Sequence, residues 1–330
     1  RDHLKGLNLD ENTILIFMTD NGTSAGCKFP GLDTEPTLGF NAGMRGKKSS
    51  IYEGGHRVPF FLHWPAGGFS KGRDIKTLAA HIDVLPTLAD LCKLPKPDKR
   101  YDVDGLSLIP LLTNKVNSWE RNHLFLQYHG GAHHKFALGP LTNSVVMTER
   151  WRLVNTDKAE ELYDIVNDPA QRNNIASQRP GIVKDLRTAY QSFWQRVSPG
   201  LKPVAIDLGD PSENPAVLCS QDWRPETGNP PWNFSSIKKI PKVTHPWLVN
   251  VLKAGKYRFT LRQWPKEADK TIAGVKAKIK IAGVEQEAVI KDGSKEINFT
   301  LTLPSGITEL WTYIYNQQGQ VGGAYFTEVE

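Results

Sequence analysis

The feature that most constrains the fold is an alternation of apolar and polar residues that extends from Trp247 almost to the end of the chain. Successive side chains of a strand point to opposite faces of a sheet, so this period of two predicts strands with one buried face. Turn residues separate five such runs, at 255–261, 275–281, 287–290, 297–303 and 309–315. The pattern predicts a small β-sandwich at 245–330.

The N-terminal third carries a different pattern, in which short apolar runs alternate with loops and a helical stripe. The run at 12–19 is almost unbroken, which predicts a fully buried strand of a parallel sheet. A second apolar run at 58–65 precedes residues 75–91, whose apolar side chains fall on one helical face. Residues 1–112 are therefore predicted to have an α/β architecture.

The apolar pattern in the middle of the chain predicts a smaller structural unit. Apolar runs at 123–128, 144–148 and 151–155 predict a small antiparallel sheet, and 180–196 has the stripe of an amphipathic helix. We assign this sheet and helix to one subdomain at 113–200. Residues 201–244 are rich in Pro, Asn and Trp without a steady period, which predicts an irregular connector.

Charge and hydropathy narrow the classes of partner. The 41 basic residues exceed the 35 acidic ones by six, and they are scattered instead of forming blocks. This distribution gives no support to nucleic-acid binding, whereas a weakly basic surface favours an anionic substrate. No apolar run approaches the roughly 18 residues that a membrane span needs, so we expect none.

Asp20 and Asn21 follow the first apolar run, at the end of a strand where open α/β sheets bind their ligands. A carboxylate oxygen and an amide oxygen are ligand types that suit Ca²⁺ or Mg²⁺. An Asp-Asn-Gly triplet is also a common turn, so these residues alone leave both interpretations open.

A second candidate site is the loop at 44–59, which combines Lys47 and Lys48 with hydroxyl groups and the Gly54-Gly55 pair. A lysine presented by a glycine-containing loop can serve as a point charge for a sulfate or phosphate oxygen. The alternative interpretation is a solvated basic loop.

Taken together and in order, these motifs closely resemble the C-terminal signature of the type I sulfatases, or arylsulfatases, of the alkaline phosphatase-like superfamily. The matching segments are Thr19-Asp20-Asn21-Gly22, Arg45-Gly46-Lys47-Lys48-Ser49 and Tyr52-Glu53-Gly54-Gly55-His56-Arg57-Val58-Pro59. The resemblance continues through 81–88, 104–108 and 161–169, and it covers residues 1 to about 200.

This resemblance implies an alkaline phosphatase-like α/β fold. Residues 1–112 would be the C-terminal part of the catalytic domain, 113–200 the C-terminal subdomain of the family, and 245–330 an added accessory β-sandwich.

The resemblance also implies roles for individual residues. Asp20 and Asn21 would be two ligands of a Ca²⁺ ion, in preference to Mg²⁺, and Lys48 would bind the sulfate of the substrate. Counting back from Tyr52-Glu53-Gly54-Gly55 selects Lys48 over Lys47. His56 is a weaker candidate for substrate binding.

The implied activity is that of a sulfuric ester hydrolase acting on sulfate esters, including those of sulfated carbohydrates. In that family the nucleophile is a formylglycine made from the Cys of a C-x-P-S-R motif. Neither Cys27, Cys92 nor Cys219 begins such a motif. We therefore expect a fragment, inactive alone, whose formylglycine and remaining metal ligands belong to a missing N-terminal half. A periplasmic or secreted location is expected, because sulfatases of this type are often exported.

Two other functions remain open. One is a phosphoester or phosphonate monoester hydrolase on the same scaffold. Phosphodiester-cleaving relatives, however, commonly carry Asp-His-Gly in place of Asp20-Asn21-Gly22. The other is a non-catalytic carbohydrate-binding protein. Its aromatic candidates are Trp247, Trp264, Trp311, Tyr313 and Tyr315, although alternate aromatics in strands more often belong to a core.

A histidine cluster gives one further candidate metal site. His129, His133 and His134 flank or follow Gly130-Gly131 in a glycine-containing loop. Such a loop is more typical of the variable rim of an active site than of a metal centre.

Overall fold

The computed structural model describes residues 1–24, 40–95, 103–115, 119–128, 143–201, 203–225, 230–231, 234–238 and 243–330. Within these residues two compact units are distinct, one ending at Ser198 and one beginning at Pro199. The helices are α1 (Asp2–Gly6), α2 (Glu53–His56), α3 (Val84–Leu91), α4 (Ile109–Leu112), α5 (Pro180–Val197) and α6 (Phe234–Lys238). None of the described helices has the length and apolar character of a membrane span.

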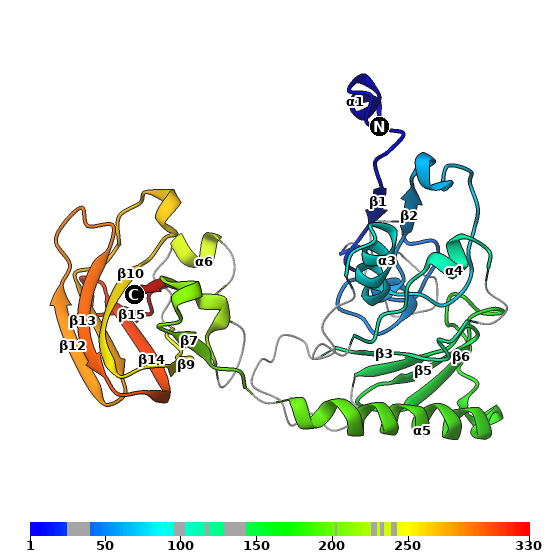
Figure 1. The fold of residues 1–330 in the computed structure, drawn as a ribbon. Coiled ribbons are helices and arrows are strands. Elements are labelled where there is room, and N and C mark those ends of the chain that lie inside the picture. The colour runs from blue at the N-terminus through cyan, green and yellow to red at the C-terminus, as the bar shows by residue number, and fades with distance from the viewer. Residues whose placement is uncertain are drawn as a thin grey trace. The chain divides into compact units, whose positions relative to one another are not determined.

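The first unit is organised by a small antiparallel sheet with the strand order β3-β4-β5-β6 (Figure 1). Its strands are β3 (Leu124–Gln127), β4 (Ser144–Met147), β5 (Trp151–Asn155) and β6 (Glu160–Asp164). The predicted strands and their hairpin are confirmed, as is the amphipathic helix, which forms α5.

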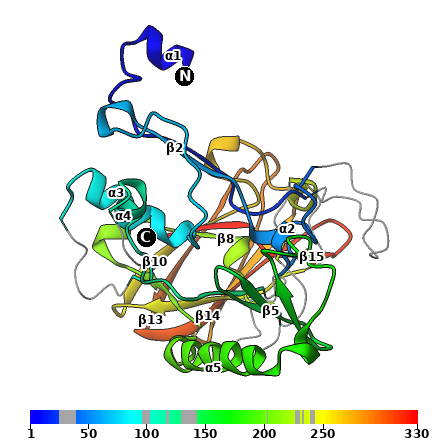
Figure 2. The ribbon, with the colours of Figure 1, turned by 90° about the vertical axis from the view of Figure 1, so that its right-hand side faces the viewer.

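One face of this sheet packs against α5, which lies along it in both views (Figures 1 and 2). Val146, Leu153 and Leu162 contribute one buried residue from each of three adjacent strands. They form a cluster with residues spaced along one face of the helix, namely Val183, Leu186 and Tyr190. Helical spacing and strand alternation thus supply the two sides of one core.

The other face of the sheet packs against the loop at 44–59. Val145, Met147, Val154 and Tyr163 alternate with the residues that face α5, and they form a second cluster with Ile51 and Tyr52. The period of two therefore sends adjacent residues to different partners, one helical and one in the candidate anion-binding loop.

The first apolar run does form a strand, but its predicted environment is wrong. β1 (Leu15–Met18) pairs antiparallel with β2 (Phe60–His63), and the two form a two-stranded sheet in the described part of the chain. Phe17 is 60% exposed and Phe61 is 65% exposed. Apolar composition shows that a strand suits burial, but it carries no information about the direction of the partner strand or about what covers it.

The helix predicted at 75–91 is shorter than expected. A 3-10 turn at His81–Asp83 leads into α3, and the Asp83 carboxylate accepts a hydrogen bond of 2.8 Å from the Ala80 N–H group. That contact satisfies a backbone donor at the start of the helical segment, which therefore begins there. Leu85 is 61% exposed, so the apolar stripe is only partly buried among the described residues.

The second unit consists of two sheets that share one hydrophobic core. Their strands are β7 (Ile206–Leu208), β8 (Ala216–Cys219), β9 (Trp247–Val251), β10 (Gly255–Arg262), β11 (Lys276–Ile281), β12 (Val284–Val289), β13 (Ile297–Leu303), β14 (Gly306–Tyr315), β15 (Val321–Gly322) and β16 (Phe326–Val329). The strand orders are β13-β10-β16-β8 and β12-β11-β14-β9-β7, with β15 paired to β14. Phe259 and Ile279, one from each sheet, belong to the same fully buried cluster.

Part of the segment at 201–244, predicted to be an irregular connector, belongs to these sheets. β7 pairs with β9, β8 pairs with β16, and Leu208, Leu218 and Trp223 lie in the shared core. Strands of three or four residues are too short to show a period, which explains why the sequence pattern did not identify them.

We predict that Leu153→Ala lowers the free energy of unfolding by about 2–5 kcal/mol, because it leaves a cavity between β5 and α5. Leu153 has no exposed surface. Urea unfolding followed by circular dichroism measures the change. Val166, which is 66% exposed, provides the control. Val166→Ala should change the free energy by less than about 0.5 kcal/mol.

Candidate functional site

The Asp20-Asn21 pair lies in the turn that follows β1. The His81 ring nitrogen lies 2.8 Å from the Thr19 carbonyl oxygen, which anchors the end of the strand. The Asn21 side-chain amide donates a hydrogen bond of 2.5 Å to the Asp20 carboxylate. The two predicted ligand side chains therefore lie together.

The turn is in direct backbone contact with the segment that carries Lys48. The Gly22 N–H group donates to the Gly55 carbonyl at 2.9 Å, and the Lys48 N–H group donates to the Thr23 carbonyl at 3.0 Å. A Cβ atom on Gly22 would lie 1.8 Å from the Gly54 carbonyl oxygen. Only glycine permits this approach, so the structure brings the predicted oxygen ligands and the predicted anion-binding segment together.

We call residues 45–55 the lysine loop. Its ends are joined by a hydrogen bond of 2.7 Å from the Gly54 N–H group to the Arg45 carbonyl. A Cβ atom on Gly54 would lie 2.3 Å from the Gly46 carbonyl oxygen, so this closure also requires glycine. Between the joined ends Lys48 is exposed, and the next residue, Ser49, has a φ of 71°.

The donor atoms at Asp20 and Asn21 fit Ca²⁺ chemically, since both residues offer hard oxygen ligands. Calcium takes about 6–8 oxygens, and these two residues supply only part of that number. The described residues contain no cluster of three or more His, Cys, Asp or Glu side chains that could complete a site. The pair therefore suits part of a coordination shell.

Near the C-terminal end of the lysine loop, the Glu53 carboxylate is completely buried. Arg152 Nε on β5 lies 2.6 Å from Glu53 Oε1, and Arg57 Nη1 lies 3.2 Å from Glu53 Oε2. Burial by itself would raise the pKa of the Glu53 carboxyl, but Arg152 and His56 hold that pKa below its ordinary value. The Gln171 side chain accepts a hydrogen bond of 2.8 Å from the Glu53 N–H group.

His56, the weaker substrate-binding candidate, belongs to the same buried cluster. Its Nε2 atom lies 3.9 Å from Glu53 Oε1 and is buried without a hydrogen-bond partner among the described residues. Burial lowers the pKa of the imidazole, although the Glu53 charge opposes that effect. A direct role in substrate binding stays a prediction.

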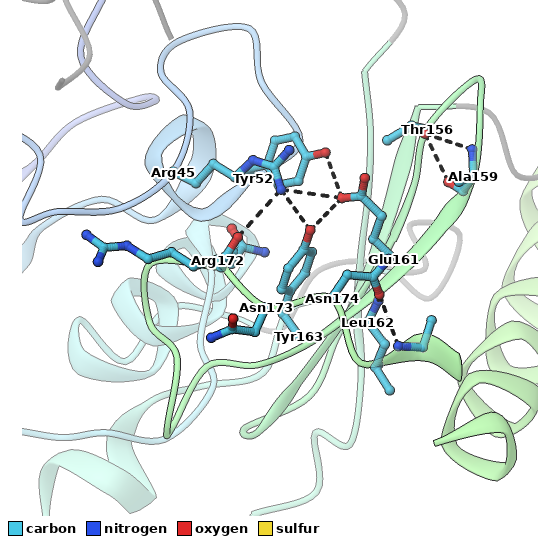
Figure 3. Close-up of polar contacts among 12 residues, drawn as sticks. Arg45, Tyr52, Thr156, Ala159, Glu161, Leu162, Tyr163, Arg172, Asn173 and Asn174 are labelled. Atoms are coloured by element: carbon cyan, nitrogen blue, oxygen red, sulfur yellow. Dashed lines mark hydrogen bonds and ion pairs between the residues drawn. The ribbon is translucent and has the colours of Figure 1, made fainter. Parts of the chain in front are cut away.

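A second polar network, which sequence reasoning missed, joins the lysine loop to β6 (Figure 3). The hydroxyl groups of Tyr52 and Tyr163 both donate to Glu161 Oε2, at 2.8 and 2.7 Å. Arg45 Nη1 lies 2.7 Å from the Tyr163 hydroxyl oxygen, and its guanidinium carbon lies 3.8 Å from the centre of the Tyr52 ring. Burial and the hydrogen bond to Glu161 raise the pKa of Tyr52 to about 12.

A signal for this network was present in the strand alternation. Glu161 and Tyr163 are separated by one residue, Leu162, which faces α5, so both face the loop. The loop partners Arg45 and Tyr52 are more than a hundred positions away and could not be inferred from that spacing.

The remaining candidates divide by location. His129, His133 and His134 lie outside the described residues, as does Cys27. Of the aromatic candidates in the second unit, Trp247 is fully buried, whereas Trp264, Trp311, Tyr313 and Tyr315 are half-buried. Trp247 therefore belongs to the hydrophobic core, as aromatic residues at alternate strand positions usually do.

We predict that Glu53→Gln lowers the free energy of unfolding by about 3–5 kcal/mol, because it leaves the Arg152 guanidinium buried without a counter-charge. Chemical denaturation measures the loss. The control is Arg150→Gln at the Arg150–Asp164 pair, where the Arg150 side chain is 54% exposed. That change should lower stability far less than Glu53→Gln does, because solvent screens the exposed pair. Equal losses in the two variants would contradict a buried charge cluster.

We predict that His56 makes stability depend on pH below its ordinary pKa of 6.5. The folded-state pKa is lowered, so the unfolded chain binds more protons as the pH falls, and protonation favours unfolding. This contribution is complete above pH 6.5 and is lost as the pH falls through the lower folded-state value. Unfolding free energies measured between about pH 7 and 5 should therefore decline less steeply in His56→Gln than in the unchanged chain. Parallel slopes would show that the imidazole does not titrate differently in the two states.

Comparison with known proteins finds sulfatases that are similar to this chain. Residues 45–193 match the family described as "N-sulphoglucosamine sulphohydrolase, C-terminal". An N-acetylgalactosamine-6-O-sulfatase of Bacteroides thetaiotaomicron is 29% identical over 215 residues, covering 58% of this chain and 38% of that protein. A steryl-sulfatase of Rattus norvegicus is 35% identical over 122 residues, covering 37% of this chain and 20% of that protein.

One solved structure, of a 2-O GAG sulfatase, aligns with a TM-score of 0.44 at 22% identity, covering 64% of this chain and 43% of that one. The chain spans less than half the length of the curated relatives named above. In its matched region the chain is similar to the C-terminal part of the sulfatases.

Proposed function

We propose that this chain is the C-terminal part of a sulfuric ester hydrolase in which Asp20 and Asn21 bind Ca²⁺ and Lys48 binds the sulfate group of the substrate. The observation that carries the proposal is the backbone pairing of the two segments, Lys48 with Thr23 at 3.0 Å and Gly22 with Gly55 at 2.9 Å. Because these contacts join main-chain atoms, side chains of the turn and of the loop are presented from one connected unit.

The chemistry of the two segments is complementary to a sulfate ester. Asp20 and Asn21 offer oxygens to a hard cation, and a bound Ca²⁺ would supply positive charge for the sulfate oxygens. Lys48 is exposed and would place an ammonium group against the same anion. Preorganised positive charge stabilises the negative charge that the sulfate group carries during transfer.

The nucleophile is proposed to lie outside these 330 residues. Formylglycine formation requires a Cys in a C-x-P-S-R motif, and none of the three cysteines begins one. The turn and the lysine loop would then supply charge and orientation, and the bond to sulfur would be made by a residue of another segment.

A sulfated glycan is the proposed substrate class. Sulfated sugars appear in the descriptions of similar proteins, including an N-acetylgalactosamine-6-O-sulfatase and a structure in complex with D-glucosamine-2-N,6-O-disulfate. The net charge of +6 favours an anionic ligand. We also propose a periplasmic or secreted location, where such polymers are accessible.

The test compares hydrolysis of an aryl sulfate with that of the matching aryl phosphate. The enzyme is this chain extended by the N-terminal region that its relatives possess, with Ca²⁺ supplied. We predict that sulfate is cleaved faster and that Lys48→Ala and Asn21→Ala each lower kcat/KM for the sulfate by about 100-fold or more.

Lys158→Ala is the matched control, because Lys158 is an exposed lysine in the loop between β5 and β6. Its activity should equal that of the unchanged enzyme. Preferential cleavage of the phosphate would instead support a phosphoester hydrolase. Unchanged sulfate cleavage in Lys48→Ala would remove Lys48 from the site.

A further inference from the structure

The lysine loop is held at both ends by one acidic residue of the neighbouring sheet. Arg45 begins the loop, Tyr52 lies near its end, and both approach Glu161 on β6 (Figure 3). Tyr52 donates to Glu161 Oε2 at 2.8 Å, and Arg45 Nη1 lies 3.5 Å from the same oxygen. Lys48 lies between these two attachment points.

The contacts reinforce one another around Glu161. Tyr163, two residues farther along β6, donates to Oε2 at 2.7 Å and also contacts Arg45 Nη1. The Arg45 guanidinium stacks on the Tyr52 ring, so the two ends of the loop also touch each other. The side chains of Arg45 and Glu161 are 24% and 19% exposed, which strengthens their electrostatic interaction relative to a pair in bulk water.

Loss of the Glu161 carboxylate would affect all three partners at once. The phenol groups of half-buried Tyr52 and buried Tyr163 would lose their acceptor, and Arg45 would lose its only ion-pair partner among the described residues. The Glu53–Arg152 pair would remain, because it joins α2 to β5 without involving Glu161. The loop would then stay attached to the sheet at Glu53, while Arg45 and Tyr52 could move apart.

We propose that Glu161 is a positioning residue that sets the conformation of the lysine loop and thereby the placement of Lys48. Its action on sulfate binding rests on the proposed function, whereas its action on the loop does not. Glu161 does not touch the substrate in this proposal. It acts through Arg45 and Tyr52.

Amide hydrogen exchange tests the effect on the loop in the 330-residue chain. The Lys48 and Gly54 N–H groups are hydrogen-bonded to Thr23 and Arg45, so their exchange rates report on loop order. Glu161→Ala should raise both rates while the amides of β4 and β5 remain protected. Glu161→Gln keeps an acceptor for the phenols and should restore much of the protection.

The chain offers a matched control at the adjacent position. Glu160 lies on the same strand but pairs with Arg187 of α5, with a distance of 2.9 Å between Glu160 Oε1 and Arg187 Nε. Glu160→Ala removes the same charge from the other face of the sheet. It should leave exchange at Lys48 and Gly54 unchanged.

A double-mutant cycle tests the effect on sulfate binding in the extended, active enzyme. Glu161→Ala should lower kcat/KM by about 100-fold, the scale expected when a binding group is displaced by about 1 Å. It should also raise the inhibition constant of inorganic sulfate. In a Lys48→Ala background the same substitution should have little further effect, because the two residues act through one interaction.

The outcomes separate the two proposals. Unchanged exchange at Lys48 and Gly54 in Glu161→Ala would overturn the positioning role, as would fully additive losses in the cycle. Increased exchange in an extended enzyme that cleaves no sulfate ester would support the role of Glu161 in the loop and reject the proposed function. If Glu161→Ala fails to fold, Glu161→Gln compared with Glu160→Gln decides the same question.

Discussion

A carboxylate without exposed surface is the constraint on which the first unit depends. Glu53 can remain ionised in its buried position only because Arg152 and Arg57 contact its two oxygens. Arg152 belongs to β5, so the requirement for a counter-charge fixes the lysine loop to the sheet. Gly54 and Gly55, the residues that follow Glu53, then meet the backbone of the loop and of the turn after β1. The charge pair, the loop and the Asp20-Asn21 turn are thus mechanically connected.

The small sheet packs against both α5 and the lysine loop, because successive side chains along its strands point to opposite faces. Leu153 and Leu162 pack against α5, whereas Arg152 and Glu161 face the lysine loop. Apolar residues on both faces supply free energy that holds the helix and the loop to the sheet, and the charged residues on the loop side specify one arrangement of the loop. A sheet stabilised on one side by a helix can therefore hold charged groups on the other.

At the candidate site, an exposed side chain is attached to a hydrogen-bonded backbone. Lys48 is exposed, yet its backbone is hydrogen-bonded to Thr23, and Ser49 beside it adopts a left-handed conformation with φ of 71°. Such a conformation in a non-glycine residue costs about 1–3 kcal/mol and persists only where the surroundings enforce it. The backbone hydrogen bonds on either side of Ser49, from Lys48 to Thr23 and from Ser50 to Lys47, hold that conformation. In the proposed function, an anion that binds Lys48 would therefore meet a backbone that is already ordered.

The sequence by itself determined the strand alternation of the second unit, the hairpin of β4 and β5, the helix α5 and the candidate pair Asp20-Asn21 with Lys48. These features depend on neighbours close in the chain or on short motifs, so local periodicity and residue chemistry sufficed. Only the tertiary structure decided that β1 pairs antiparallel with β2, that β7 and β8 belong to the sheets of the second unit, and that Glu161 holds both ends of the lysine loop. Those contacts join residues tens to more than a hundred positions apart, and no local pattern encodes which distant side chains share a buried face.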